Sequence, residues 1–388
     1  MLLVGGGTGG HITPLLAVAH SIKKQSKSTR IVYIGEKHSK FVDLTRNVSD
    51  IDKVYRISAG KFRRYHDESW FKRLFDFKTN AQNVRDCFYT LVGIAQSCRL
   101  LGKVRPDIVF IKGSFVGVPV GLACGIMGIP YITHDSDTLP GLANRIISRK
   151  AYLHAVGMPK DFYDYPKEKT EYVGIPLSKD YRPVTQGIQK KYRDELNIQH
   201  TARVLCVTGG SLGAQRVNDG MEPVVDNLLR EFDDLYVLHQ TGSSAKSLYT
   251  NIPAGLRSRI ITKEFVSDLY LYTGAANIVV ARAGATTIAE LARQGKATVL
   301  IPNPLLTGGH QIKNAEHLHD SQAVEILTEE QLHNVTEASD MLAGLLRSTE
   351  RQKKLGQKLS TFANPDAATT IAAMIERATV HTQKDRTP

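Results

Sequence analysis

The sequence predicts an α/β protein of two Rossmann-like, doubly wound domains, each a parallel sheet covered by helices on both faces. Three observations lead to this prediction. Two glycine-rich stretches lie about two hundred residues apart, and each joins an apolar strand pattern to a helix pattern. Strand and helix patterns alternate through both halves of the chain, as they do in parallel sheets. The length of 388 residues exceeds one ordinary core and fits two domains.

The first glycine-rich stretch, called the first glycine loop here, covers residues 5–11 and reads GGGTGGH after the apolar residues 2–4. Because glycine has no Cβ, backbone N–H groups at the start of the following helix can approach an anion such as a phosphate. His11 ends this loop, where the helix dipole disfavours the imidazolium form. We therefore expect His11 to act as a general base.

The same loop also fits a dinucleotide-binding site. Gly5, Gly7 and Gly10 satisfy the pattern G-x-G-x-x-G, and Glu36 ends the next expected strand about where a ribose-binding acid would lie. A nicotinamide-dependent oxidoreductase therefore stays open. A second glycine loop, His11 itself and the lack of an obvious hydride-transfer constellation in the sequence count against it.

The rest of the first half alternates between strands and helices. Strands are expected over residues 2–4, 30–35, 107–112 and 131–134, and helices over residues 14–24, 83–101, 118–127 and 142–150. A linker between domains is expected next, because Gly174, Pro176 and Pro183 interrupt the strand and helix patterns. We expect the first domain to cover residues 1–173 and the second to cover residues 174–364.

The second half repeats this order with different residues. Strands are expected over residues 204–207, 235–240, 259–261, 278–281 and 298–301, and helices over residues 331–346 and 367–378. The second glycine loop, residues 209–214, reads GGSLGA directly after the first of these strands. In a pair of such domains, the active site is expected in the crevice between them.

A third string, residues 282–290, reads RAGATTIAE directly after an expected strand. Its small residues let the backbone approach a ligand, and Thr286 and Thr287 supply hydroxyls at a helix start. Glu290 can accept hydrogen bonds from both hydroxyls of a ribose. The alternative is a capped helix whose Glu290 is solvated. Further on, His310 and Gln311 belong to a polar loop that can hold sugar hydroxyls.

Positive charge is concentrated in the first part of the chain. Residues 1–150 hold 23 Lys and Arg against 11 Asp and Glu, whereas the remainder holds 27 of each. Within residues 61–78, called the basic aromatic stretch here, most apolar side chains fall on one face of a helix: Trp70, Phe71, Leu74 and Phe75. This pattern suits the surface of an anionic bilayer, although ordinary core packing also explains the aromatic residues. No recognisable nucleic-acid-binding motif accompanies the charge.

Neither a metal site nor a disulfide framework is expected. The four cysteines lack the spacing that zinc or disulfides need. The string Asp135-Ser136-Asp137 mimics the D-x-D pair that binds a divalent metal in many nucleotide-sugar enzymes. A sugar-hydroxyl contact or a role in starting the next helix fits its place after a strand better. No run of eighteen residues lacks a polar interruption, so we expect a cytosolic protein without a membrane-spanning helix.

Together these strings resemble the MurG-type glycosyltransferases of family 28, the UDP-N-acetylglucosamine:undecaprenyl-diphospho-muramoylpentapeptide enzymes of bacterial peptidoglycan synthesis. The resemblance covers nearly the whole chain and rests on several motifs in the same order. These are the first glycine loop with Pro14 and Ala17, His134, Gly141-Leu142, Asn144, the second glycine loop, His239-Gln240, Glu264-Phe265, residues 284–290, and Gln311 with Asn314.

The resemblance implies the GT-B fold, with a final helix over residues 365–380 packing back on the N-terminal domain. The C-terminal domain would bind UDP-GlcNAc and the N-terminal domain the lipid acceptor. Donor contacts are implied for Thr8, Gly9, Gly10, Ser211, Gly213, Phe265, Val266, Ala285, Thr286, Thr287, Glu290, His310 and Gln311. Acceptor contacts are implied for Gly7, Phe115, His134 and Asp137. Catalysis falls to His11, and no metal or other cofactor is required.

The implied reaction is an inverting transfer of GlcNAc to the muramoyl 4-hydroxyl of undecaprenyl-diphospho-MurNAc-pentapeptide. This step turns lipid I into lipid II for cell wall biogenesis, cell shape and cell division. The enzyme would be peripheral at the cytoplasmic face of the cell membrane, docked through Trp70, Phe71, Leu74 and Phe75, with other cell-wall enzymes as partners. Two alternatives stay open: a GT-B transferase acting on diacylglycerol or another polyprenyl lipid, and a UDP-GlcNAc 2-epimerase.

Some positions depart from the family pattern. Asp135-Ser136-Asp137 stands where a Glu-Gln-Asn string is common, and Ser114 interrupts a glycine pair. Leu212 replaces a Gln of the second glycine loop, and Ala283 replaces a Ser. We expect these changes to affect the acceptor and the donor sugar more than the fold.

Overall fold

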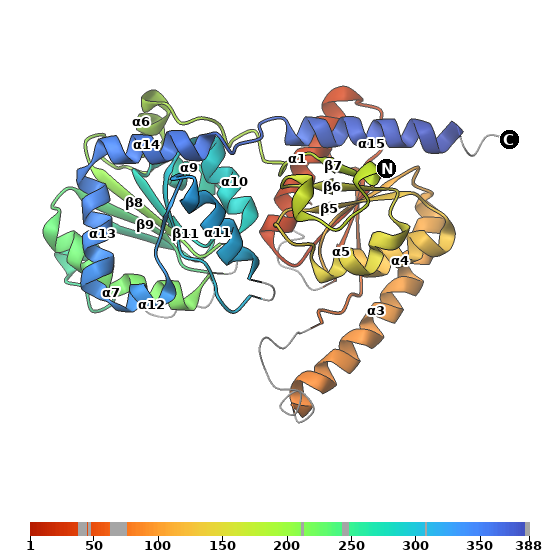
Figure 1. The fold of residues 1–388 in the computed structure, drawn as a ribbon, viewed down its shortest axis with the longest axis horizontal. Helices are drawn as coiled ribbons and strands as arrows, with labels where there is room; N and C mark the ends of the chain where they lie inside the picture. The colour runs from red at the N-terminus through yellow and green to blue at the C-terminus, as the bar shows by residue number, and fades with distance from the viewer. Residues whose placement is uncertain are drawn as a thin grey trace. The chain divides into compact units, whose positions relative to one another are not determined.

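The computed structural model describes residues 1–37, 45, 48–62, 76–210, 213–242, 248–306 and 309–384. The chain divides into two compact units (Figure 1). Unit 1 comprises Met1–Ser178 and Asn364–Pro388, and unit 2 comprises Lys179–Ala363. In the described part of the chain, no helix is both long enough and apolar enough to cross a bilayer.

Unit 1 is built on a parallel sheet. Its described residues form seven strands in the order β3-β2-β1-β4-β5-β6-β7. The strands are β1 (Leu2–Val4), β2 (Val32–Glu36), β3 (Lys53–Ile57), β4 (Val109–Lys112), β5 (Tyr131–Asp135), β6 (Leu153–Val156) and β7 (Thr170–Tyr172). The central strands are buried along nearly their whole length, because helices cover both faces. The strand order reverses between β1 and β4, so the loops after these two strands form the switch point of the sheet.

Helices cover both faces of this sheet (Figure 1). They are α1 (Gly9–Gln25), α3 (Phe77–Val104), α4 (Gly117–Met127), α5 (Leu142–Ile147) and α15 (Ala367–Lys384). Leu3 of β1 packs toward α1 and α15, whereas its neighbours Leu2 and Val4 belong to the core under α4. This alternation is the two-residue period of a strand that is apolar on both faces. α15 therefore completes the core of unit 1 although it comes from the far end of the chain.

Unit 2 repeats the plan. Its described residues form six parallel strands in the order β10-β9-β8-β11-β12-β13. The strands are β8 (Arg203–Thr208), β9 (Leu235–Gln240), β10 (Ile260–Lys263), β11 (Ile278–Ala281), β12 (Ala297–Leu300) and β13 (Glu325–Ile326). The helices are α6 (Gln186–Glu195), α7 (Gln215–Glu231), α8 (Ala254–Arg257), α9 (Leu269–Ala275), α10 (Ala285–Gln294), α11 (His310–Asp320), α12 (Glu329–His333), α13 (Val335–Arg347) and α14 (Thr349–Ser360). The switch point lies between β8 and β11.

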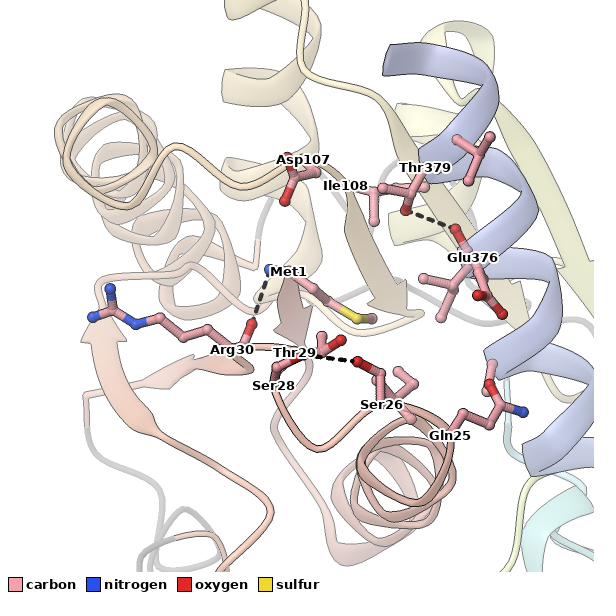
Figure 2. Close-up of a pocket in the computed structure, with 14 residues that line it drawn as sticks. Met1, Gln25, Ser26, Ser28, Thr29, Arg30, Asp107, Ile108, Glu376 and Thr379 are labelled. Atoms are coloured by element: carbon pink, nitrogen blue, oxygen red, sulfur yellow. Dashed lines mark hydrogen bonds between the residues drawn. The ribbon is translucent and has the colours of Figure 1, made fainter. Parts of the chain in front are cut away.

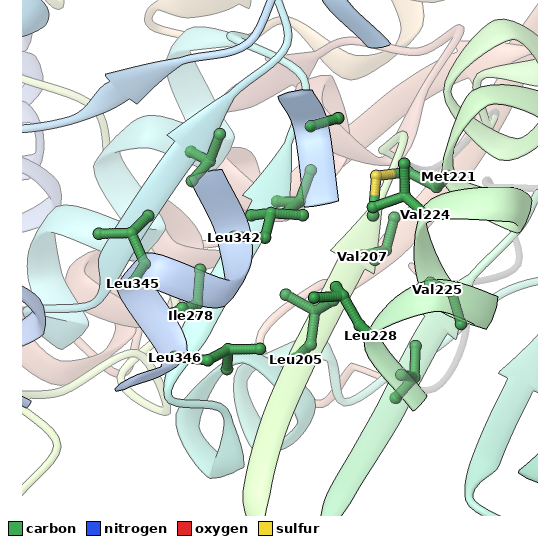
Figure 3. Packing of buried hydrophobic residues seen from close by; sticks show 14 of the residues in the cluster. Leu205, Val207, Met221, Val224, Val225, Leu228, Ile278, Leu342, Leu345 and Leu346 are labelled. Atoms are coloured by element: carbon green, nitrogen blue, oxygen red, sulfur yellow. The ribbon is translucent and has the colours of Figure 1, made fainter. Parts of the chain in front are cut away.

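Two hydrophobic cores cover the two faces of the unit 2 sheet. On one face, Leu205 and Val207 of β8 pack with Leu228 of α7 and Leu342 of α13 (Figure 3). On the other face, Cys206, between those two residues in sequence, packs with side chains of α9 and α10. Burial on both faces fixes the register of β8 and hence the place where the second glycine loop begins.

Several sequence-based expectations about the elements need correction. Strands β3, β6, β7 and β13 were not expected. β3, β7 and β13 are edge strands with polar residues, and His154 interrupts the apolar pattern of β6. The single helix expected over residues 331–346 is two helices, α12 and α13. Asn334 separates them because its side chain accepts a hydrogen bond from the Glu337 N–H group at 3.3 Å and caps α13. The last helix runs to Lys384 and does not end at residue 378.

Replacing Met374 with Ala is expected to destabilise the protein. Met374 lies on α15, is 0% exposed and packs in the core that α15 shares with α1. The cavity should lower the free energy of unfolding by about 2–5 kcal/mol. Denaturant unfolding measures this change. Thr369→Ala, at an exposed position of the same helix, is the matched control and should change it by less than about 0.5 kcal/mol. Equal stability of the two variants would contradict the packing of α15 described here.

Candidate functional site

In unit 1, three loops converge at the carboxyl ends of β1, β4 and β5, which are neighbours in the sheet. Gly7 of the first glycine loop has a φ of +88°, and a Cβ on it would lie 2.9 Å from the Phe115 ring in the loop after β4. Gly113 donates its N–H group to the His134 carbonyl oxygen of β5 at 3.1 Å. The positive φ and the close approach both require glycine at position 7.

His11 lies in the first turn of α1. Its Nδ1 atom is buried and has no hydrogen-bond partner within the described residues. Burial and, second, the charge of Lys112 lower the pKa of His11 to about 3. The imidazole is therefore neutral at pH 7 and can accept a proton, although burial and the charge of Lys112 disfavour the protonated form.

Further polar atoms at this edge are buried without a partner in the part of the chain that the structure describes. They are the Ser114 and Thr138 hydroxyl oxygens and Nδ1 of His134. Proteins satisfy nearly all such atoms with protein groups, water or a ligand. Together with His11, these atoms mark the edge as a place for a polar ligand. No sequence motif contains Thr138 and would have predicted a ligand contact there. Ser114 was noted in the sequence only as a departure from the family pattern.

Lys112, the last residue of β4, is a buried cation beside these atoms. It is 2% exposed, and its Nζ donates a hydrogen bond to the Ser136 hydroxyl. Burial lowers the pKa of Lys112 to about 8, against the opposing effect of the Asp137 and Asp135 carboxylates. No motif in the sequence marks this lysine, which reads as the polar end of an apolar strand.

His134 and Asp135 hold the loops in place. His134 is fully buried, and its Nε2 donates to the Gly174 carbonyl oxygen at 3.0 Å, so the structure gives it a positioning role. The Asp135 carboxylate accepts hydrogen bonds from the Gly141 N–H group at 3.1 Å and the Tyr165 hydroxyl at 2.9 Å. Since Gly141 is the N-cap of α5, Asp135 helps to start that helix. Among the described residues, no three His, Cys, Asp or Glu side chains are grouped as metal ligands.

In unit 2, Gln240 at the end of β9 organises the corresponding edge. Its Nε2 donates to the Gly210 carbonyl oxygen at 2.9 Å, and its Oε1 accepts from the Val266 N–H group at 3.1 Å. This buried side chain thereby joins the second glycine loop to the segment after β10, where Phe265 is 42% exposed. Gly213 has a φ of +76°, and a Cβ on it would lie 2.4 Å from the Thr241 carbonyl oxygen, so no other residue fits.

Residues 282–290 connect β11 to α10 through residues 282–284 and then form the first turns of that helix. Arg282 is 8% exposed, pairs with Glu329, and donates to the Ile301 carbonyl oxygen at 3.2 Å. These contacts fix the end of β11. α10 then begins at Ala285, and its N-cap Gly284 provides no side-chain cap. The N–H groups of the first turn must therefore find partners other than a capping side chain.

Two side chains of α11 reach back to this string. Asn314 donates through Nδ2 to the Ala283 carbonyl oxygen at 3.2 Å, and a Cβ on Gly284 would lie 4.0 Å from Nε2 of Gln311. Gln311 also accepts, through Oε1, the Asn303 N–H group at 3.0 Å. The first turns of α11 therefore lie beside the start of α10.

Glu290 lies in the second turn of α10. Burial raises the pKa of its carboxyl to about 8, and a hydrogen bond donated by the Tyr181 hydroxyl acts in the opposite direction. The residue is half-buried, so the alternative of a freely solvated Glu290 does not hold. Tyr181 has no sequence motif, and its link to Glu290 becomes visible only in the fold.

The structure thus brings the expected site residues together as two groups, one in each unit. The group in unit 1 contains Gly7, Thr8, Gly9, Gly10, His11, Phe115, His134 and Asp137. The group in unit 2 contains Gly213, Phe265, Val266, Ala285, Thr286, Thr287, Glu290, His310 and Gln311. Ser211, Trp70, Phe71, Leu74 and Phe75 lie outside the described residues.

A cavity of about 420 Å³ in unit 1 is lined by none of the expected site residues (Figure 2). It is lined by residues that precede strands, such as Met1, Arg30 and Asp107, and by Glu376 and Thr379 of α15. The Met1 amine donates to the Arg30 carbonyl oxygen there at 3.0 Å. The cavity is therefore at the amino ends of the strands, opposite to the first glycine loop, and we assign no chemistry to it.

Both halves of the chain match one enzyme family. The glycosyltransferase family 28 N-terminal domain matches residues 1–155, and the family 28 C-terminal domain matches residues 204–371. A protein of Clostridium perfringens named UDP-N-acetylglucosamine--N-acetylmuramyl-(pentapeptide) pyrophosphoryl-undecaprenol N-acetylglucosamine transferase is 32% identical over 370 residues. The match covers 94% of each chain.

Solved structures share the fold. The crystal structure of MurG from Acinetobacter baumannii matches with a TM-score of 0.67 at 22% identity, over 97% of this chain and 99% of that one. UDP-GlcNAc 2-epimerase from Neisseria meningitidis, bound to UDP-GlcNAc, matches with a TM-score of 0.66 at 13% identity over the same shares. The expected GT-B fold is confirmed. With both family domains in order and this identity over nearly its whole length, the chain belongs to glycosyltransferase family 28 and is a sugar-transferring enzyme.

Proposed function

We propose that this enzyme transfers GlcNAc, with inversion, from UDP-GlcNAc to the muramoyl 4-hydroxyl of undecaprenyl-diphospho-MurNAc-pentapeptide. The product is lipid II of peptidoglycan synthesis. The observation that carries the proposal is the match, over 94% of each chain, with the Clostridium perfringens transferase whose name gives these substrates. The two groups of site residues support it, because one suits a nucleotide sugar and the other suits a polar, anionic acceptor.

The donor would bind at the unit 2 group. Its ribose hydroxyls would meet Glu290, and its uracil would lie against Phe265. Because Gln240 already engages the Val266 N–H group, uracil would use other backbone atoms of this segment. The diphosphate would meet Ser211 and Gly213, and the sugar would meet Ala285, Thr286, Thr287, His310 and Gln311.

The departing UDP needs a group that stabilises its growing negative charge. α7 and α10 both begin after glycines, at the carboxyl edge of the unit 2 sheet, and neither has a side-chain cap. The N–H groups and the positive dipole end of such helices stabilise anions. In our proposal they replace the metal ion that serves this role in other transferases.

The acceptor would bind at the unit 1 group, with Gly7 and Phe115 on its sugar side and Asp137 near a hydroxyl. His11 would remove the proton of the attacking hydroxyl. The low pKa of His11 keeps it unprotonated before the reaction. The diphosphate of the acceptor, if bound at the first glycine loop, would raise this pKa and make the proton transfer easier.

The proposed reaction is tested by offering the purified protein a short-chain lipid I with UDP-GlcNAc, UDP-glucose or UDP-galactose. We expect lipid I to gain the mass of one N-acetylhexosamine, with UDP-GlcNAc preferred by about a hundredfold or more, because the sugar contacts must distinguish the acetamido group. Transfer of a hexose, or transfer to diacylglycerol alone, would favour the related transferase. Isomerisation of UDP-GlcNAc without any acceptor, seen by NMR, would favour the epimerase.

Replacing His11 with Ala should lower kcat by about a hundredfold or more, as expected for loss of a general base. The dissociation constant for UDP should stay within about twofold, because His11 acts on the acceptor. Steady-state kinetics and calorimetry measure the two effects. His20→Ala, an exposed histidine of the same helix, is the control and should change neither. Equal losses of turnover and UDP affinity in the His11 variant would count against its role as base.

A lipid-linked acceptor also requires contact with a membrane, and α3 offers a surface for it. Val84, Phe88 and Leu91 are 72%, 62% and 60% exposed and recur at the spacing of one helix face. The N-terminal half of α3 stands away from the sheet of unit 1 (Figure 1). In the sequence, the basic aromatic stretch, residues 61–78, runs into the start of this helix at Phe77. We infer that the two together dock on the anionic cytoplasmic surface of the membrane.

Replacing Phe88 with Asp should weaken binding to vesicles that contain anionic phospholipid by about tenfold or more, the loss expected when one aromatic side chain no longer leaves water. Vesicle co-sedimentation at low salt measures the affinity, and added salt should weaken binding of the wild type. Phe162→Asp, an exposed aromatic residue outside α3, is the control. Unchanged binding of the Phe88 variant would contradict docking through this face.

A further inference from the structure

The chain passes from unit 1 to unit 2 between Ser178 and Lys179, and Tyr181 follows two residues later. Both ends of the Tyr181 side chain are engaged within unit 2. Its hydroxyl donates a hydrogen bond to the Glu290 carboxylate of α10. Its ring meets the Tyr270 ring of α9 edge-on, with 6.2 Å between centroids and 76° between planes.

The Tyr270 ring is itself fixed from its other side. It meets the Tyr192 ring of α6 edge-on, with 5.8 Å between centroids. Tyr192 is 4% exposed and belongs to the hydrophobic core of unit 2. A row of three aromatic rings therefore runs from the core to the Tyr181 hydroxyl. This packing keeps the hydroxyl in one place, so Glu290 receives a hydrogen bond from a fixed donor.

Glu290 needs such a donor because it is half-buried and has lost part of its contact with water. A carboxylate that leaves water must be satisfied by hydrogen bonds, or it becomes protonated. An ionised carboxylate can accept a hydrogen bond from the Tyr181 hydroxyl and still has lone pairs on its two oxygens that can accept from two further hydroxyls. A protonated carboxyl has lost part of this accepting capacity. The Tyr181 hydroxyl therefore favours the form of Glu290 that can accept hydrogen bonds from both hydroxyls of a ribose.

We propose that Tyr181 is a positioning residue of the donor site, which favours the ionised form of Glu290 and orients its carboxylate to receive the ribose of a uridine nucleotide. This inference rests on the proposed donor role of Glu290. It adds to that role a residue on the segment that enters unit 2, outside the glycine loops and outside residues 282–290.

The titratable groups around this pair, in the part of the chain described, fall into two sets. The Tyr181 hydroxyl acts on Glu290. Glu290, the Cys206 thiol of β8 and the neighbouring Asp180 act on Tyr181. Burial, followed by the effect of Glu290, holds the pKa of Tyr181 well above its ordinary value, so the hydroxyl stays a donor at every pH near neutrality. The pH dependence of ribose binding should therefore follow Glu290.

The test is the affinity of the full-length protein for UDP and for 2′,3′-dideoxy-UDP, measured by calorimetry between about pH 7 and about pH 9, on either side of the Glu290 pKa of about 8. The wild type should prefer UDP, and this preference should grow as the pH rises and Glu290 ionises. Tyr181→Phe should bind UDP about tenfold more weakly at about pH 7, as expected for loss of one hydrogen bond to a charged group. As the pH is raised, the affinity of this variant for UDP should increase at a higher pH than that of the wild type. The variant and the wild type should bind the dideoxy nucleotide equally well.

Two controls separate positioning from folding. Tyr270→Phe removes a hydroxyl from the next ring and should leave UDP affinity unchanged, and thermal unfolding should show all variants folded. Glu290→Gln should abolish both the preference for UDP and its pH dependence. A wild type that binds the two nucleotides equally would overturn the donor role of Glu290. A wild type that prefers UDP, with a Tyr181→Phe variant of the same affinity and pH profile, would overturn the inference about Tyr181 alone.

Discussion

The architecture depends on glycine at the two points where a strand at a switch point turns into a long helix. A Cβ on Gly5 would lie 2.6 Å from Cδ1 of Leu15 and 3.0 Å from the His11 carbonyl oxygen, and one on Gly209 would lie 2.5 Å from the Ala214 backbone nitrogen. These approaches are at or below the closest that real Cβ atoms make, so a side chain at either position would displace the start of the following helix. With glycine, the first N–H groups of α1 and α7 stay at the carboxyl edge of their sheets. This closeness of backbone to backbone is what makes both edges suited to anions.

The two units use buried ionisable groups in opposite ways. In unit 1, burial and the Lys112 charge keep His11 neutral, which suits a group that must start the reaction without a proton. In unit 2, burial pushes Glu290 toward its neutral form, and the Tyr181 hydroxyl pushes it back toward the carboxylate. Buried ionisable groups reduce folding stability unless partners compensate them. Such costs are expected at sites where binding or chemistry, and not packing, has determined the residues.

The sequence predicted the features that depend on neighbours along the chain. The glycine loops, the central apolar strands and the string over residues 282–290 are local patterns, and the central strands lie where expected within about two residues. Edge strands such as β3 and β13 were not predicted, because a short strand with solvent on one side has little apolar pattern. His134 illustrates another limit. The resemblance implies an acceptor contact for it, but only the fold reveals that its ring is buried against Gly174.

The residues that sequence reasoning missed act through contacts between distant parts of the chain. Lys112, Thr138 and Tyr181 stand in no motif, and the groups around them become neighbours only when the sheets form. The central physical claim is that main-chain N–H groups, without a cation, hold the diphosphate of the donor. Calorimetry of UDP binding in EDTA and then in excess Mg²⁺ tests it most directly. We expect the same dissociation constant in both conditions, within about twofold; binding that disappears in EDTA and returns with Mg²⁺ would contradict the claim.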